Sequence, residues 1–439
     1  MGVALPHCKG EYQLRDSLMV TCIAGVGNTG ATKGAKLLLA AFPKSCTSFS
    51  VRSNPPDYSA DTWWCISNHQ RWSCDAAFLG VEPSAWSDGM AFDLGSDRAA
   101  RAGRALAGGK RFVCWGIVGD IDMFCNHLYL PHWSIDNMCL GGLCLAQKKA
   151  GPFVYNDFRE DHSYWLKNPL SPQHVRENHP SEHRHPWFSI PGMSTLMVHF
   201  GVMHCFDQNG CLAHALAGVL FEIVFLQIGG NRASALAFVW KRIVALYAKV
   251  GATYRLSKLT LDMFCTSKAP FQNYPCLSTA IKAAETRQLL PVVLELSREF
   301  DTGTKHHENR RVMLGHLAAF YDAMKSAPTI PSREDGRVIF QSCRDFLLVY
   351  QACSHWALSE GHLLYNTPGK FHHTFHLGQQ GRYLNPRATW EYAYEDFVGK
   401  MITLGHACAF GSVTFKLSLR IARKYVIAFH LQLMRHWDD

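Results

Sequence analysis

The stretch from Arg111 to Trp133 places an acidic residue where α/β enzymes often carry catalytic charge. It predicts a buried strand over Phe112–Val118, then Gly119-Asp120, then a helix. A turn that ends a buried strand aims its side chain in a fixed direction, so Asp120 is a candidate metal-binding carboxylate. The alternative is that Asp120 only caps the N-terminus of the following helix. The residues alone favour the cap.

A pair of cysteines, Cys139 and Cys144, lies on either side of a Leu-Gly-Gly-Leu turn. Two thiolates at this spacing can bind Zn²⁺, with Cys125, His127 or His132 as candidates for the remaining ligands. The alternative is that both cysteines simply belong to a tight turn, since no second cysteine pair follows.

The composition describes a chain that can bury a large core. Of its 439 residues, 48% are hydrophobic and 18% charged, and the net charge is +9. This basic excess is compatible with a polyanionic partner. The 16 cysteines are scattered along a long chain, which favours reduced thiols over a disulfide scaffold. The longest apolar run, residues 211–228, contains His214 and Glu222, so we expect a buried helix and no membrane span.

Glycines near the N-terminus follow the pattern G-x-G-x-x-G at Gly25, Gly27 and Gly30. Such glycines let backbone N–H groups approach a pyrophosphate, so a nucleotide-dependent enzyme is one hypothesis. No acidic residue follows at the usual distance, and no βαβ series is visible downstream. The simpler interpretation is a glycine-rich turn.

A series of short blocks between about residues 100 and 425 resembles the catalytic region of CACTA-type eukaryotic DNA transposases and their transposon-derived relatives. The order is G-D, L-P-H-W, the cysteine pair, N-D-F-R, H-P-W-F-S-I-P-G, V-M-H, K-A-A-E-T-R, K-F-H-x3-H, L-N-P-R and E-D-F-V-G-K. The resemblance implies an α/β fold, with a ribonuclease H-like mixed-sheet core, extensive helical insertions and a helical C-terminal half. It also implies three carboxylates that hold Mg²⁺ or Mn²⁺ for DNA strand cleavage and transfer.

Carried over block by block, the resemblance implies a metal-binding role for Asp120. Glu285, in K-A-A-E-T-R, is the leading candidate for the third acid, and Glu395, in E-D-F-V-G-K, is its rival. The first acid should follow an early strand, and Asp88 or Asp93 is the candidate, with no motif that decides between them. The simpler interpretation of Glu285 is a surface residue of a helix, and the simpler interpretation of Asp88 is a turn residue.

One block departs from the family pattern. The family has an Asp-x-x-His element, and this chain reads Gly201-Val-Met-His204. The histidine is present, which makes His204 a candidate catalytic residue, but the acid is missing. Without the family, His204 is more simply interpreted as a core histidine of the apolar strand region, where a strand-like segment over residues 195–202 leads into Met203-His204-Cys205.

Three regions follow from these patterns: a glycine-rich unit over 1–60, a transposase-type core over 61–300 with a loop insertion at about 145–192, and a helical region over 301–439. The first functional hypothesis is a nuclear, transposase-like protein that binds DNA at transposon ends, with its homo-oligomeric state left open. The second is an inactive transposon-derived DNA-binding or scaffold protein, which the loss of the acid at Gly201 favours.

Overall fold

A computed structural model describes most of the chain. The described residues are 2–4, 17–24, 36–43 and 61–437, except 132–138, 140–143, 152, 179–184, 267 and 410–413. The glycine motif at Gly25–Gly30 and His132 lie outside the described residues.

The expected ribonuclease H-like mixed-sheet core is wrong, because the described chain is mainly helical. One sheet has three antiparallel strands in the order β1 (Gly2–Ala4), β2 (Ser17–Ala24) and β3 (Lys36–Pro43). The other has two three-residue strands, β4 (Ile117–Gly119) and β5 (Val198–Phe200). The predicted strand over Phe112–Val118 is therefore mostly extended chain, and half-exposed Phe112 and Val113 are not buried.

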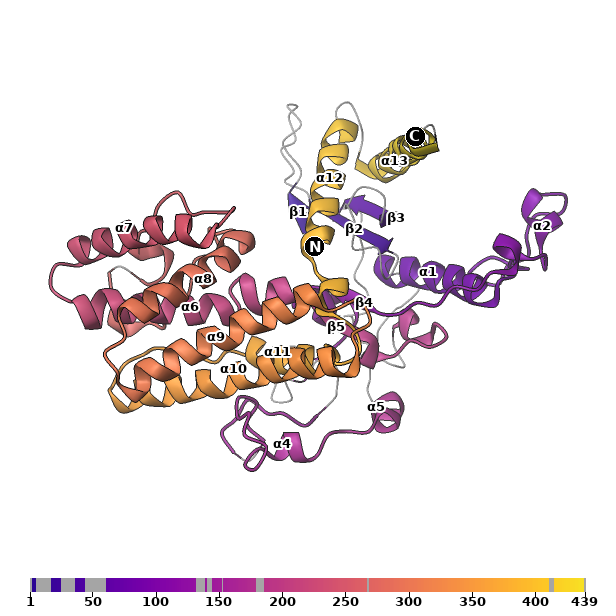
Figure 1. The fold of residues 1–439 in the computed structure, drawn as a ribbon. Coiled ribbons are helices and arrows are strands. Elements are labelled where there is room, and N and C mark those ends of the chain that lie inside the picture. The colour runs from indigo at the N-terminus through magenta and orange to yellow at the C-terminus, as the bar shows by residue number, and fades with distance from the viewer. Residues whose placement is uncertain are drawn as a thin grey trace. The chain divides into compact units, whose positions relative to one another are not determined.

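The chain divides into two compact units, each assembled from segments far apart in the sequence. The first contains residues 1–130, 171–198 and 392–439, and the second contains residues 131–170 and 199–391. The second unit is a helical assembly whose elements are shown in Figure 1. Its principal helices are α6 (Cys211–Phe221), α7 (Arg232–Val250), α8 (Ala283–Glu299), α9 (Lys305–Ser326), α10 (Arg333–Ser359) and α11 (Lys370–Gln380), with the short α4 (Tyr164–Lys167).

Helix α6 forms the centre of the second unit, and every one of its residues is buried. Its sequence, CLAHALAGVLF, has no charged residue and is apolar on all sides, which is typical of a helix surrounded by others. Gly218 lets Tyr365 approach closely, since a Cβ at this position would lie 2.7 Å from the tyrosine ring. Five-residue and seven-residue π-helical segments, Met203–Asp207 and Glu222–Ile228, flank α6.

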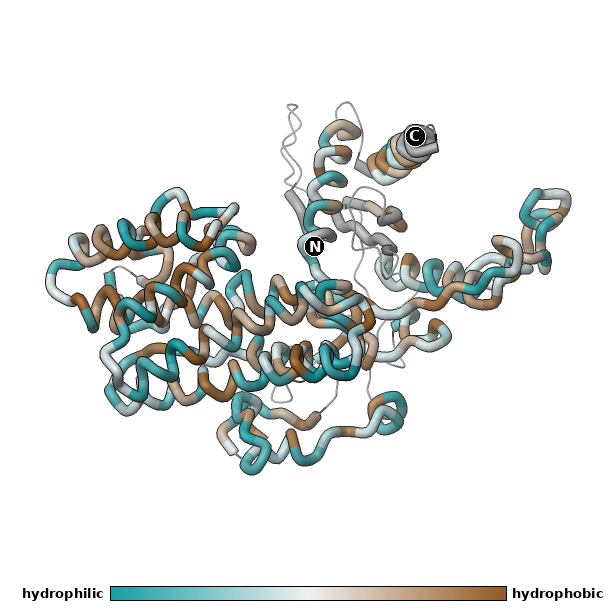
Figure 2. Tube along the Cα trace, in the orientation of Figure 1, coloured by the Kyte–Doolittle hydropathy of each residue, from teal (hydrophilic) through white to brown (hydrophobic). Residues whose placement is uncertain are grey.

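Helices α9 and α10 pack side by side along their length (Figure 1). The buried residues of α10 include Ile339, Cys343, Phe346 and Tyr350, which recur every three or four positions. Hydrophobic and hydrophilic positions alternate accordingly along the helix (Figure 2). This pattern places one apolar stripe toward α9 and α11 and leaves the opposite side exposed.

The first unit contains the three-stranded sheet together with helices of very different lengths. Its helices are α1 (Thr62–Leu79), α2 (Asp97–Arg101), α3 (Ile121–His127), α5 (Pro172–Asn178), α12 (Tyr392–Ala409) and α13 (Thr414–Trp437). Helix α13 packs on β3 and α12, where Leu417 and Ile421 join Ala41 and Cys408 in a small apolar cluster.

One helical stretch, Met203–Ile228, is long and apolar enough to cross a membrane by composition alone. Its most apolar window is 78% buried inside the structure. It is the predicted buried run, with Glu222 held by interactions inside the second unit.

Candidate metal centre

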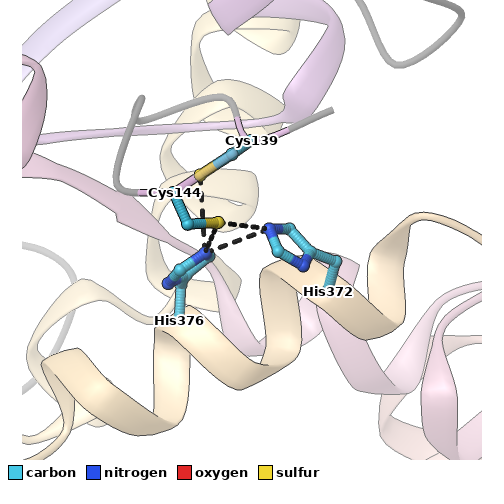
Figure 3. A group of neighbouring side chains, drawn as sticks. All are labelled: Cys139, Cys144, His372 and His376. Carbon is cyan, nitrogen blue, oxygen red and sulfur yellow. Dashed lines mark hydrogen bonds between the residues drawn. The ribbon is translucent and has the colours of Figure 1, made fainter. Parts of the chain in front are cut away.

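Four side chains converge in the second unit: Cys139, Cys144, His372 and His376. All four are buried, and their ligand atoms lie within 4.8 Å of one another. The cysteines lie close together in the sequence, whereas the histidines lie one turn apart on α11 (Figure 3). Residues four apart share one face of a helix, so both imidazoles point toward the sulfurs.

The distances match a tetrahedral zinc site. The Cys139 Sγ is 3.4 Å from the His376 Nε2, and the Cys144 Sγ is 3.4 Å from the His372 Nε2 and 3.6 Å from the His376 Nε2. Zn–S and Zn–N bonds of about 2.3 and 2.0 Å at tetrahedral angles place sulfur and nitrogen about 3.5 Å apart. The two Nε2 atoms are 3.1 Å apart, close to the roughly 3.3 Å that the same geometry requires.

The outer nitrogens of both imidazoles are held by hydrogen bonds. The Nδ1 of His372 lies 3.2 Å from the Tyr155 carbonyl oxygen, and the Nδ1 of His376 lies 2.8 Å from the side-chain oxygen of Gln379. Both partners are acceptors, so Nδ1 carries the proton and Nε2 presents its lone pair to the centre. This arrangement is characteristic of metal-bound histidines.

Apolar rings surround the histidines. The edge of the Trp165 ring packs against His372 at 4.6 Å between centroids, and Phe200 stacks near His376 at 6.5 Å. Trp165 is itself buried and donates a hydrogen bond to the Val154 carbonyl. The centre is therefore closed to bulk water on these sides.

The cysteines are electrostatically prepared to bind a cation. Burial alone would raise the pKa of Cys139, but hydrogen bonding with Cys144 and the neighbouring histidines outweighs it and lowers this pKa well below its usual value. Burial raises the pKa of Cys144, and the adjacent Cys139 raises it further. Cys139 is therefore held as a thiolate, which is the form that binds metal.

The predicted zinc cysteines are thus brought together, but with different partners from those expected. Cys125 and His127 lie on α3 in the other compact unit and do not belong to the group. His372 and His376 were missed as ligands, although the block K-F-H-x3-H contained the signal. Two histidines four residues apart on a helix can bind one metal ion together. Cys139 and Cys144 supply only two of the four ligands that a structural zinc site requires, so two more were to be expected elsewhere in the chain.

The predicted acidic residues are mostly engaged in local structure. Asp120 is the N-cap of α3, with its Oδ1 accepting a hydrogen bond from the Met123 backbone N–H at 2.6 Å. Glu285 lies in the first turn of α8 and accepts from the Lys282 N–H at 2.9 Å. Each carboxylate therefore satisfies a donor that the helix leaves unpaired.

Two further candidates also have local roles. Asp88 is exposed in a turn and accepts from the Met90 N–H at 3.0 Å. His204 lies in the π-helical segment that follows β5, so the expected strand position is wrong. In the part of the chain that the structure describes, the Cys2His2 group is the only set of three or more such side chains close enough to share a metal.

Two of the predicted acids in the first unit influence each other electrostatically. Burial raises the pKa of Glu395 on α12, and the negative charge of Asp120 raises it further. Asp120 and Glu395 therefore lie close enough to interact electrostatically. Glu285 and His204 belong to the other compact unit.

A different acid occupies the space that the family aspartate would need at Gly201. A Cβ built on Gly201 would lie 1.5 Å from the Cδ of Glu391. Glu391 is fully buried, and its Oε2 accepts a hydrogen bond from the Met203 N–H at 3.1 Å. Gly201 therefore makes room for a carboxylate from a distant part of the chain.

Comparison of the sequence with protein-family models, with curated proteins and with solved structures found no match.

Proposed function

We propose that the chain is a zinc-stabilised DNA-binding or scaffold protein of transposon descent in which the Cys2His2 centre has a structural role. The observation that carries this proposal is the closed, buried set of four protein ligands. Structural zinc sites have four protein ligands, whereas catalytic sites leave one position for water or substrate. The zinc would fasten Cys139 and Cys144 to α11, which is more than 200 residues away in the sequence.

DNA binding is supported by charge. The net charge of the chain is +9, and α13 contains no acidic residue over 414–437. Lys416, Arg420, Arg423 and Lys424 are exposed and recur at helical spacing, while Leu417 and Ile421 pack against the unit on the adjacent face. A basic stripe of this kind fits the phosphate backbone of DNA.

The zinc role is tested by metal analysis of the purified full chain. We expect one equivalent of zinc in the wild type and loss of zinc in Cys139→Ser and in His376→Ala. Cys205→Ser is the matched control, because this buried cysteine of the same unit is outside the group. A wild type that binds no zinc when refolded with excess Zn²⁺ would refute the structural role.

DNA binding is tested by salt dependence. Each phosphate contact contributes about 0.9 to the slope of log K against log salt concentration, so Arg420→Gln/Lys424→Gln should lower the slope by about 2. The control is Lys305→Gln/Arg337→Gln, in which each cation is already paired with Glu308 or Glu334 on its own helix. Equal slopes for the two double variants would contradict binding through α13.

A second candidate function, divalent-metal-dependent cleavage, is favoured by one observation: the proximity of Asp120 and Glu395. Two carboxylates supply part of the oxygen ligand set that Mg²⁺ uses in nucleases. We expect any Mg²⁺- or Mn²⁺-dependent nicking of DNA to be lost in both Asp120→Asn and Glu395→Gln. Equal nicking by the wild type and both variants would exclude this function while leaving the zinc and DNA-binding proposals intact.

A further inference from the structure

Two cysteines outside the metal centre face each other in the first unit. The Sγ atoms of Cys74 and Cys114 are 3.5 Å apart. Cys74 lies in the C-terminal half of α1, and Cys114 lies in the extended segment that leads into β4. Both side chains are partly exposed, so a small solute can reach them.

Backbone hydrogen bonds hold the two cysteine-bearing segments side by side. Helix α1 ends at Gly80 in a left-handed conformation with φ 69°, and the Gly80 carbonyl accepts from the Leu106 N–H at 2.8 Å. The chain then runs back along α1, where the Phe112 N–H donates to the Ala77 carbonyl at 2.9 Å. Cys114 follows two residues later and therefore lies over Cys74, about one helical turn before Ala77.

The pair is chemically asymmetric. The hydrogen bond with Cys74 lowers the pKa of Cys114 to about 7. The same contact and burial raise the pKa of Cys74. The nearby carboxylate of Asp75, which is paired with Arg71 at 2.9 Å, raises the pKa of both thiols by charge repulsion. Cys114 is therefore the nucleophile of the pair near neutral pH.

We propose that Cys74 and Cys114 form a reversible disulfide, a redox-modification site that fastens α1 to the segment preceding β4. A disulfide bond is about 2.05 Å long, so the sulfurs need to approach by about 1.5 Å. This site is independent of the zinc ligands and of the proposed DNA-binding function. It also departs from the expectation that the cysteines are simply reduced thiols.

The oxidant is a low-molecular-weight disulfide of the glutathione class. The Cys114 thiolate attacks one sulfur of the oxidant, which breaks its S–S bond, forms a mixed disulfide and releases one thiolate. The Cys74 thiol then loses its proton to solvent and attacks the Cys114 sulfur, expelling the second thiolate. The protein loses two protons and two electrons, and one oxidant molecule becomes two thiols.

The experiment titrates the full-length chain in mixtures of reduced and oxidised glutathione, followed by alkylation of free thiols, non-reducing digestion and mass spectrometry. We expect a cross-linked peptide joining residues 74 and 114, with a mass about 2 Da below the sum of the two reduced peptides. Cys74→Ala should instead accumulate a glutathione adduct on Cys114. Cys74→Ala also removes the hydrogen bond that lowers the pKa of Cys114, so this adduct should form more slowly at pH 7 than the wild-type disulfide does.

Cys65→Ser is the matched control and should cross-link as the wild type does. Circular dichroism of each reduced variant establishes that it is folded before oxidation. Cys74→Ser serves the same purpose as Cys74→Ala if the alanine variant does not fold. Separate adducts on Cys74 and Cys114 throughout the titration, without a cross-linked peptide, would overturn the proposal.

Discussion

Gly201→Ala should destabilise the second unit severely, because the space beside Gly201 is filled by the carboxylate of Glu391. The added methyl carbon would lie 1.4 Å from Oε1, 1.5 Å from Cδ and 1.8 Å from Oε2 of this residue. No rotation of the methyl group relieves such overlap, so Glu391 has to leave its buried position. Its hydrogen bond with the Met203 N–H is then lost.

The magnitude follows from two costs. Overpacking a well-filled core costs about 1–3 kcal/mol, and leaving a buried hydrogen-bonding group without its partner costs about 1–3 kcal/mol. We therefore expect Gly201→Ala to lower the free energy of unfolding by about 2–6 kcal/mol, a large part of the stability of a typical domain. Gly201→Asp should cost more, since it also buries a second carboxylate.

The assay is urea denaturation followed by circular dichroism. Gly315→Ala is the control, because Gly315 lies inside α9 with no atom within 4 Å of an added Cβ. There, replacement of a helical glycine should stabilise the protein by about 0.5–1 kcal/mol. In a Glu391→Ala background, Gly201→Ala should cost much less than in the wild type. A cost below about 1 kcal/mol in the wild type, or an equal cost in both backgrounds, would refute the reasoning.

Three further outcomes follow from buried groups and caps. Burial alone would raise the pKa of Glu222, but His306 and Arg310 outweigh it and hold this pKa below its usual value. The ionised carboxylate therefore contributes stability above pH 4.5, and this contribution is lost as the pH falls through the lowered pKa. Unfolding measured between pH 7 and 3 should therefore depend less steeply on pH in Glu222→Gln. Arg310→Met, which leaves this carboxylate without its buried cation, should cost about 3–5 kcal/mol in the same assay at pH 7. Asp120→Ala should cost about 0.5–2 kcal/mol by loss of the α3 cap, whereas Asp120→Ser should preserve most of the stability.

The sequence predicted half of the metal centre. Cys139 and Cys144 stood out because their spacing is short and local, so two thiols around a turn can be recognised without the fold. The histidines were equally recognisable as a pair on one helix, but nothing in the sequence indicates which pair of cysteines they meet. That choice depends on tertiary packing across 228 residues between Cys144 and His372.

The predicted fold class is wrong, and one reason is that short apolar runs do not distinguish a buried strand from a buried helix. Residues after Gly201 were interpreted as the end of a strand that leads to His204. In the structure the strand ends at Phe200, and a π-helical segment begins at Met203. Length alone could not settle the choice, since the helical nature of this region depends on the helices that surround α6.

The acidic residues show why a carboxylate next to a helix start is ambiguous. Metal binding and N-capping both require an oxygen acceptor with a fixed direction at the same kind of turn, so Asp120 satisfies the sequence pattern of either role. The structure separates the roles by partners: Asp120 accepts from Met123 in its own helix and also acts electrostatically on Glu395. Capping uses one oxygen of the carboxylate, so it leaves the second oxygen for a cation. Asp120→Asn therefore distinguishes the roles, because asparagine is as good a cap as aspartate but lacks the charge that a cation requires.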